Sequence, residues 1–150
     1  MLSIERSDPA APDAVALLDA LSEALAAISG DSGRASFDAD DVRGARACFV
    51  VARGHGGRAL GCGALRPLQD DIAEIKRMYA APGSAGVGSA LLDWLEAEAA
   101  SLGYGAVWLE TRLVNARALR FYQSRGYARI ANYGKYAGRA DAVCLGKRLG

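Results

Sequence analysis

The chain has 150 residues, of which 51% are hydrophobic and 23% charged, and these are the proportions of one globular domain with its own core. Eighteen basic and 17 acidic residues give a formal net charge of +1, which excludes the basic excess of a duplex-binding protein and the charge imbalance of a disordered one. Three cysteines without a CxxC pair and a single histidine exclude a disulfide scaffold and a multi-histidine metal site.

The first half of the chain predicts one long helix followed by three antiparallel strands. A short strand at residues 2–5 precedes a helix from Ala11 to Ser29, whose apolar side chains recur at helical spacing and which Gly30 ends. A polar segment with a short helix near residues 39–42 follows. The pattern then changes to three strands joined by tight turns, at residues 48–53, 59–67 and 72–80.

The second half predicts alternating helices and strands. A glycine-rich loop at residues 82–88 leads into an apolar helix, and a strand at residues 106–111 follows the glycines that end this helix. Asn115 is a good N-cap for a further helix that runs to about Ser124. The last two strands lie near residues 127–131 and 142–147. This order predicts a single α/β domain over residues 1–150, with a mixed sheet and helices on its faces.

The segment from Glu74 to Leu92 is the most informative, because a strand runs into a glycine-rich loop and then directly into a helix. Such a loop presents backbone N–H groups at the positive end of the helix dipole, and glycines let an anion approach closely, so we expect a pyrophosphate site. A Walker A loop is disfavoured because Ser89 and Ala90 stand where it needs Lys and Ser or Thr. The dinucleotide pattern GxGxxG also fails, because Leu91 stands at its third glycine.

Four segments, in this order along the chain, together resemble the GCN5-related N-acetyltransferase (GNAT) superfamily. They are EIKRMY at residues 74–79, GSAGVG at 83–88, SALLDWLEAEAASLGY at 89–104 and NARALRFYQSRGY at 115–127. The resemblance covers the chain from about Phe49 to its C-terminus. It implies a GNAT-like fold with a mixed, mostly antiparallel central sheet, and it implies acetyl-CoA as co-substrate with no metal ion.

The resemblance also implies which residues bind the co-substrate. In the superfamily the loop motif Q/R-x-x-G-x-G/A holds the pyrophosphate of acetyl-CoA, and Gly86 and Gly88 match its two small positions. Gly83 stands at the Gln or Arg position, so we expect weakened affinity rather than lost function. The end of the preceding strand has backbone groups for the pantetheine arm, and Asn115 either caps its helix, touches coenzyme A, or does both. The expected residues are Met78, Tyr79, Ala80, Gly83, Ser84, Ala85, Gly86, Val87, Gly88, Ser89 and Asn115.

Acetyl transfer from a thioester to an amine needs one group that takes a proton from the amine and another that protonates the leaving thiolate. Tyr122 is the candidate for the second role, because the resembled superfamily places an acid tyrosine here and a phenol of pKa about 10 stays protonated at neutral pH. Glu74 is the candidate for the first role, on the same strand face as Lys76 and Met78. Each has a structural alternative, since Tyr122 also belongs to an apolar stripe and Glu74 could be an ion-pair partner of Lys76 or Arg77.

We therefore expect an acetyl-CoA-dependent N-acetyltransferase that moves the acetyl group directly to a primary amine of a small molecule or of a protein or peptide, since no residue is placed as a covalent nucleophile. The alternatives are a non-catalytic acyl-CoA-binding or regulatory module on the same fold and, less consistent with the motifs, a nucleotide-binding α/β protein. The acceptor would be chosen by the first helix, residues 31–46 and residues 132–136. No apolar stretch approaches the roughly 18 residues of a membrane span, so we expect a cytoplasmic protein without a nucleic-acid or membrane partner. The sequence leaves the acceptor, and the choice between monomer and homodimer, open.

Overall fold

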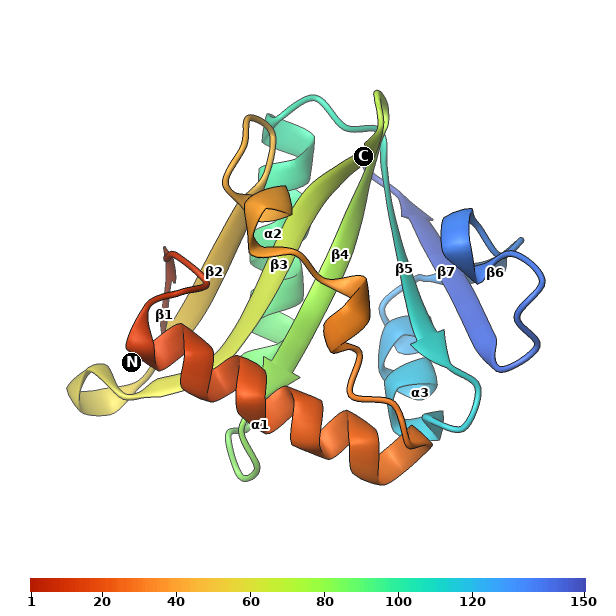
Figure 1. Cartoon of the computed structure of the whole chain (residues 1–150). Coiled ribbons are helices and arrows are strands. Elements are labelled where there is room, and N and C mark those ends of the chain that lie inside the picture. Colours follow the sequence, from red (N-terminus) through yellow and green to blue (C-terminus); the bar gives the residue numbers. More distant parts are fainter.

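A seven-stranded sheet in the order β1-β2-β3-β4-β5-β7-β6 forms the centre of the computed structural model, which describes residues 1–150 (Figure 1). All neighbouring strands are antiparallel except β4 and β5, which are parallel. The strands are β1 (Ser3–Arg6), β2 (Cys48–Arg53), β3 (Ala59–Gln69), β4 (Ile72–Ala80), β5 (Ala106–Arg112), β6 (Ala128–Ile130) and β7 (Ala142–Arg148). The expected mixed, mostly antiparallel sheet is confirmed.

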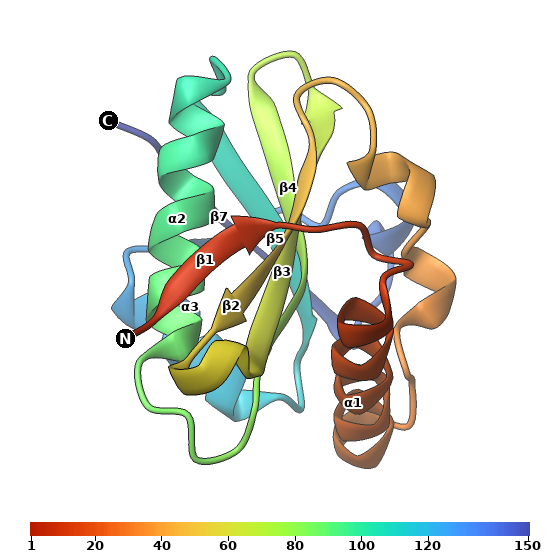
Figure 2. The same cartoon turned by 90° about the vertical axis from the view of Figure 1, so that its left-hand side faces the viewer.

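Three α-helices cover the two faces of this sheet. The helix α1 (Pro12–Ser29) lies on one face, whereas α2 (Val87–Ser101) and α3 (Ala116–Ser124) lie on the other (Figure 2). Proline stands in the first turn of α1, where its missing N–H costs no hydrogen bond. Gly30 ends α1 with a φ of +80°, and its N–H donates to the carbonyl of Ala26, as expected of a glycine at a helix end. Short 3₁₀ helices complete the chain: η1 (Arg34–Ser36), η2 (Ala39–Val42), η3 (His55–Gly57) and η4 (Gly134–Tyr136).

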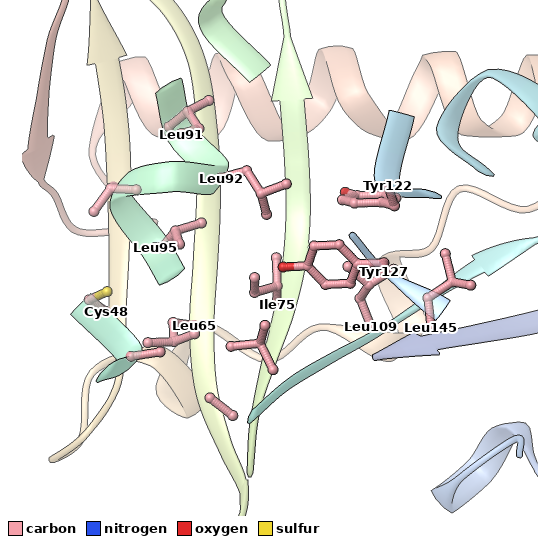
Figure 3. Close-up of a cluster of buried hydrophobic side chains, with 14 of the residues drawn as sticks. Cys48, Leu65, Ile75, Leu91, Leu92, Leu95, Leu109, Tyr122, Tyr127 and Leu145 are labelled. Atoms are coloured by element: carbon pink, nitrogen blue, oxygen red, sulfur yellow. The ribbon is translucent and has the colours of Figure 1, made fainter. Parts of the chain in front are cut away.

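Each face of the sheet has its own apolar core. Under α2, the side chains of Leu91, Leu92 and Leu95 are fully buried against the sheet (Figure 3). Burying a leucine side chain stabilises the fold by about 1.5–3 kcal/mol, so these three residues hold the start of α2 firmly in place. A smaller core joins Ala14 and Leu17 of α1 to the opposite face. The strand β4 is therefore fixed from both sides.

A β-bulge at Arg77 changes the direction of the side chains along β4. In the pairing of β3 with β4, the single residue Gly63 stands opposite both Arg77 and Met78, and Arg77 has a φ of +55°. As a result, Met78 packs against the core under α2, whereas Lys76 contacts Tyr136 outside that core. The expectation that Met78 shares a face with Lys76 is therefore wrong, because strict alternation holds only in a strand without a bulge.

Candidate active site

The strands β4 and β5 are paired only over their first residues and then separate (Figure 1). The last pair joins Glu74 to Trp108. From Ile75 to Ala80, the edge of β4 that faces β5 therefore has no strand partner, and its backbone groups remain free for a ligand. The predicted residues Met78, Tyr79 and Ala80 all lie on this stretch.

The loop between β4 and α2 presents unpaired N–H groups at the N-terminus of α2. Gly83 and Gly86 have φ values of +81° and +80°, which explains why the chain has glycine at both positions. The N–H groups of Val87, Gly88 and Ser89 donate to no acceptor in the chain, and no side chain caps the helix. Together with the helix dipole, these donors form a site suited to a diphosphate.

Arg125 brings a positive charge to the same loop from the end of α3. Its guanidinium donates a hydrogen bond to the hydroxyl of Ser89 and lies 3.7 Å from a carboxylate oxygen of Asp93. Sequence reasoning did not select Arg125, because nothing local indicates that the end of α3 lies beside the start of α2. Gly83 has no side chain that could bring a positive charge to the loop. Arg125 brings one from the end of α3 instead.

One cavity connects the predicted catalytic residues. Glu74, Met78, Asn115 and Tyr122 all line it, between the separated ends of β4 and β5. Its open volume is about 140 Å³, close to the roughly 150 Å³ of an engineered protein cavity that binds benzene. The space therefore suits a small chemical group rather than a folded partner.

Glu74 is held in this cavity by two hydrogen bonds. Its side chain is 3% exposed, Arg66 donates to Oε1 across 2.8 Å, and the phenol of Tyr133 donates to Oε2 across 2.6 Å. The ammonium of Lys76 lies 3.9 Å from Oε1. A carboxylate has about four lone-pair sites, so Glu74 keeps acceptor capacity for a further donor. Glu74 is thus both an ion-pair partner and a residue open to the cavity.

Tyr122 lies on α3, on the other side of the cavity. Its side chain packs edge-on against the rings of Phe121 and Tyr127, while its hydroxyl makes no hydrogen bond within the chain. Burial raises the pKa of Tyr122 above its ordinary value near 10, so the phenol keeps its proton at neutral pH. On the same helix, the side chain of Asn115 accepts a hydrogen bond from the N–H of Ala118, which confirms the predicted cap.

The structure adds charged residues that sequence reasoning did not select. Glu110 on β5 lines the cavity, and burial raises the pKa of its carboxyl group. Arg112 pairs with Glu110 and, across 3.0 Å, with Asp31 at the end of α1. Arg77, expected as a possible ion-pair partner of Glu74, also lines the cavity but forms no ion pair with that carboxylate. The first helix, Asp31, Ser36 and Tyr136 thus meet here, in the regions expected to contact an acceptor.

No group of three or more histidine, cysteine, aspartate or glutamate residues is arranged to hold a metal ion. No helix combines the length and apolar character needed to cross a bilayer.

Comparison with known proteins gives consistent matches. Residues 14–127 match the model of the acetyltransferase (GNAT) family. An "IAA acetyltransferase" from Azospirillum brasilense is 29% identical over 138 residues, which cover 90% of each chain.

Solved structures match over nearly the whole length. A GNAT-family acetyltransferase from Staphylococcus aureus Mu50 has a TM-score of 0.81, with 15% identity and all of both chains covered. A GNAT-family acetyltransferase from Elizabethkingia anophelis, with acetyl-CoA bound, has a TM-score of 0.72 and 16% identity, and the match covers 99% of this chain and 98% of that one. At such identities the structural likeness shows a shared fold.

Proposed function

The chain belongs to the acetyltransferase (GNAT) family, and on this premise we propose that it transfers the acetyl group of acetyl-CoA directly to a primary amine. The observation that carries the proposal is the single cavity that Tyr122 enters from α3 and Glu74 from β4. A proton donor and a proton acceptor thus face one space between two separated strands, next to a loop built for an anion.

The diphosphate of coenzyme A binds the N–H groups of Val87, Gly88 and Ser89. Support comes from the absence of any partner for these donors in the chain and from the guanidinium of Arg125 beside them. Hydrogen bonds to an ionised phosphate are stronger than those between neutral groups, which offsets the missing side chain at Gly83. The pantetheine arm lies along the unpaired edge of β4, from Met78 to Ala80.

Acetyl-CoA supplies the acetyl group as a thioester, and the protein moves two protons. Glu74 accepts a proton from the amine, whose nitrogen forms a bond to the acetyl carbon as the bond from carbon to sulfur breaks. Tyr122 donates its phenolic proton to the leaving sulfur. Holding an amine of pKa about 10.4 neutral at pH 7 costs about 4.6 kcal/mol, and a carboxylate at the amine offsets part of this cost.

Glu110 supports this arrangement from β5. Its carboxylate, which pairs with Arg112, attracts the protonated amine; the amine loses one proton to solvent on binding, and Glu74 takes the second as the neutral nitrogen attacks. Burial raises the pKa of Glu110, which brings that pKa closer to neutral pH than the pKa of an exposed glutamate. Glu110 is therefore the second candidate for the residue that takes the proton from the amine, and a test of this role compares it with Glu74.

The proposal is tested by thermal melting with acetyl-CoA and by a thiol-release assay with a panel of primary amines. We expect acetyl-CoA to raise the melting temperature and at least one amine to accelerate release of coenzyme A. Binding without release on any amine would favour the non-catalytic acyl-CoA-binding module. No heat of binding with millimolar coenzyme A in calorimetry would exclude both functions.

A further inference from the structure

Arg77 is a largely buried cation that no carboxylate of the chain neutralises. Its guanidinium donates to the hydroxyl of Ser22 on α1 across 2.5 Å and to the backbone carbonyl of Ser32 across 3.3 Å. Both acceptors are uncharged. Its Nε is buried without any hydrogen-bond partner, and no carboxylate oxygen lies within 4.0 Å of the guanidinium. Burial of a charge without a counter-ion costs free energy, so the position calls for an explanation.

The other cations that line the cavity are all compensated. Lys76 lies 3.9 Å from the carboxylate of Glu74, and Arg112 lies 3.0 Å from that of Asp31. Burial lowers the pKa of Arg77, and the nearby charge of Arg34 lowers it further. Arg77 is therefore the one lining cation whose charge the protein leaves without a partner.

The surroundings of Arg77 are apolar as well as charged. The cavity wall beside it is formed by Leu21, Leu25 and Ile28 of α1. Ile28 is 48% exposed, although its side chain is large and apolar. The α1 side of the cavity thus combines a guanidinium that has no carboxylate partner with apolar side chains, of which Ile28 is exposed, while Glu74 and Glu110 lie on its strands.

We propose that the acceptor amine carries a carboxylate, which binds Arg77, and an apolar portion, which packs against the α1 side chains of the cavity. This inference rests on the proposed function and names the substrate class for the same site: an apolar amino acid or a related amino-carboxylate. Its amino group lies toward the carboxylates of Glu74 and Glu110.

A carboxylate fits the site better than a phosphate does. One guanidinium neutralises the single charge of a carboxylate, and its planar N–H groups match the two oxygens. A phosphate dianion would need a second free cation, yet the neighbouring Arg34 is already paired with Asp19 across 3.1 Å.

The test compares pairs of amines that differ only in the carboxylate. The pairs are leucine with 3-methylbutylamine, phenylalanine with 2-phenylethylamine, and 6-aminohexanoate with pentylamine. With coenzyme A present, we expect the carboxylated member of at least one pair to raise the melting temperature and its partner to have no effect at the same concentration. Equal shifts within every pair, or no shift with any carboxylate, would overturn the inference.

A variant tests whether the preference for a carboxylated amine depends on Arg77. The Arg77→Met variant keeps an unbranched side chain at the bulge, and we expect it to lose at least tenfold in affinity for the carboxylated member. Without ligand, its melting temperature should be unchanged or higher, because an uncompensated buried charge is removed; a purely structural role predicts a lower one. Arg53→Met is the matched control, since it removes a guanidinium that Glu5 and Asp13 neutralise away from the cavity and should leave the preference intact.

The proposed function and the assignment of Arg77 as the residue that binds a carboxylate are contradicted by different results. Absence of coenzyme A binding would remove the proposed function itself. Thiol release from amines with no preference for a carboxylate would remove only the assignment of Arg77. The ligand pairs on the unmodified chain decide this point even where the Arg77→Met variant does not fold.

Discussion

The phenol of Tyr133 donates a hydrogen bond to Oε2 of Glu74 across 2.6 Å. Tyr133 lies in the segment before η4, 59 residues from Glu74, so this bond connects the C-terminal part of the chain to β4. Burial, followed by the negative charge of Glu74, raises the pKa of Tyr133, and the phenol therefore stays a donor at neutral pH. The orientation of the proposed base is thus fixed before substrate binds.

We predict that Glu74→Gln lowers kcat by about 100-fold or more, because an amide cannot take the proton of the amine. The substitution also removes the charge that compensates Arg66 and Lys76, and loss of one partner of a buried pair costs about 3–5 kcal/mol of the free energy of unfolding. Steady-state kinetics and urea denaturation measure the two effects.

Two further variants control this experiment. Tyr133→Phe removes one hydrogen bond but keeps the carboxylate, so it should cost about 1 kcal/mol of stability and reduce kcat far less than Glu74→Gln does. Glu110→Gln removes the other carboxylate of the cavity. Should Glu110→Gln abolish turnover while Glu74→Gln keeps it, the base would be Glu110 and Glu74 an ion-pair partner alone.

Tyr122→Phe should lower kcat by about 100-fold or more while the affinity for acetyl-CoA changes little, because only the proton donor is lost. The ring of Tyr122 still packs against its aromatic neighbours, so the fold should be retained. Since burial raises the pKa of Tyr122 above 10, the acid form persists as the pH rises, and no alkaline decline from this phenol should occur up to pH 10. Full turnover in the variant would remove Tyr122 from the mechanism.

Much of the fold follows from short-range patterns in the sequence. Helical spacing, turn residues and the glycine of a helix end act over a few residues, so the order of helices and strands was predictable. Of the proposed site, Glu74, Tyr122 and Asn115 were found because they lie in motifs. Tyr122 and Glu74 do line one cavity, and this geometry supports the pairing that the motifs suggested.

The remaining features of the site depend on contacts between distant segments. Arg77 turns toward α1 because a bulge interrupts the alternation of β4, and no residue pattern in β4 predicts that bulge. The pair between Asp31 and Arg112 joins residues 81 positions apart. Arg125 approaches Ser89 only because α3 folds back beside α2. Such pairings are set by tertiary packing, which periodicity does not encode.

The pyrophosphate loop can be tested with two glycines in the same backbone conformation. Gly86 in the loop and Gly30 at the end of α1 both have a φ of +80°, and an added Cβ at either position would meet no atom within 4 Å. We predict that Gly86→Ala and Gly30→Ala each lower the free energy of unfolding by about 1–2 kcal/mol, the cost of a left-handed conformation with a side chain. Only Gly86→Ala should weaken coenzyme A binding in calorimetry, by about tenfold. Equal affinities in the two variants would show that the loop does not hold the diphosphate.

Direct transfer predicts that no cysteine takes part in the reaction. All three cysteines are buried, and burial raises the pKa of Cys62 to about 12, so its reactive thiolate is scarce at pH 8. Its thiol donates to the carbonyl of Arg77 rather than to a base. Iodoacetamide at pH 8 should therefore leave activity intact over a time in which it alkylates all three cysteines of the urea-unfolded chain. Initial rates against both substrates should give intersecting double-reciprocal lines; parallel lines, together with an acetylated cysteine in mass spectra, would establish a covalent intermediate instead.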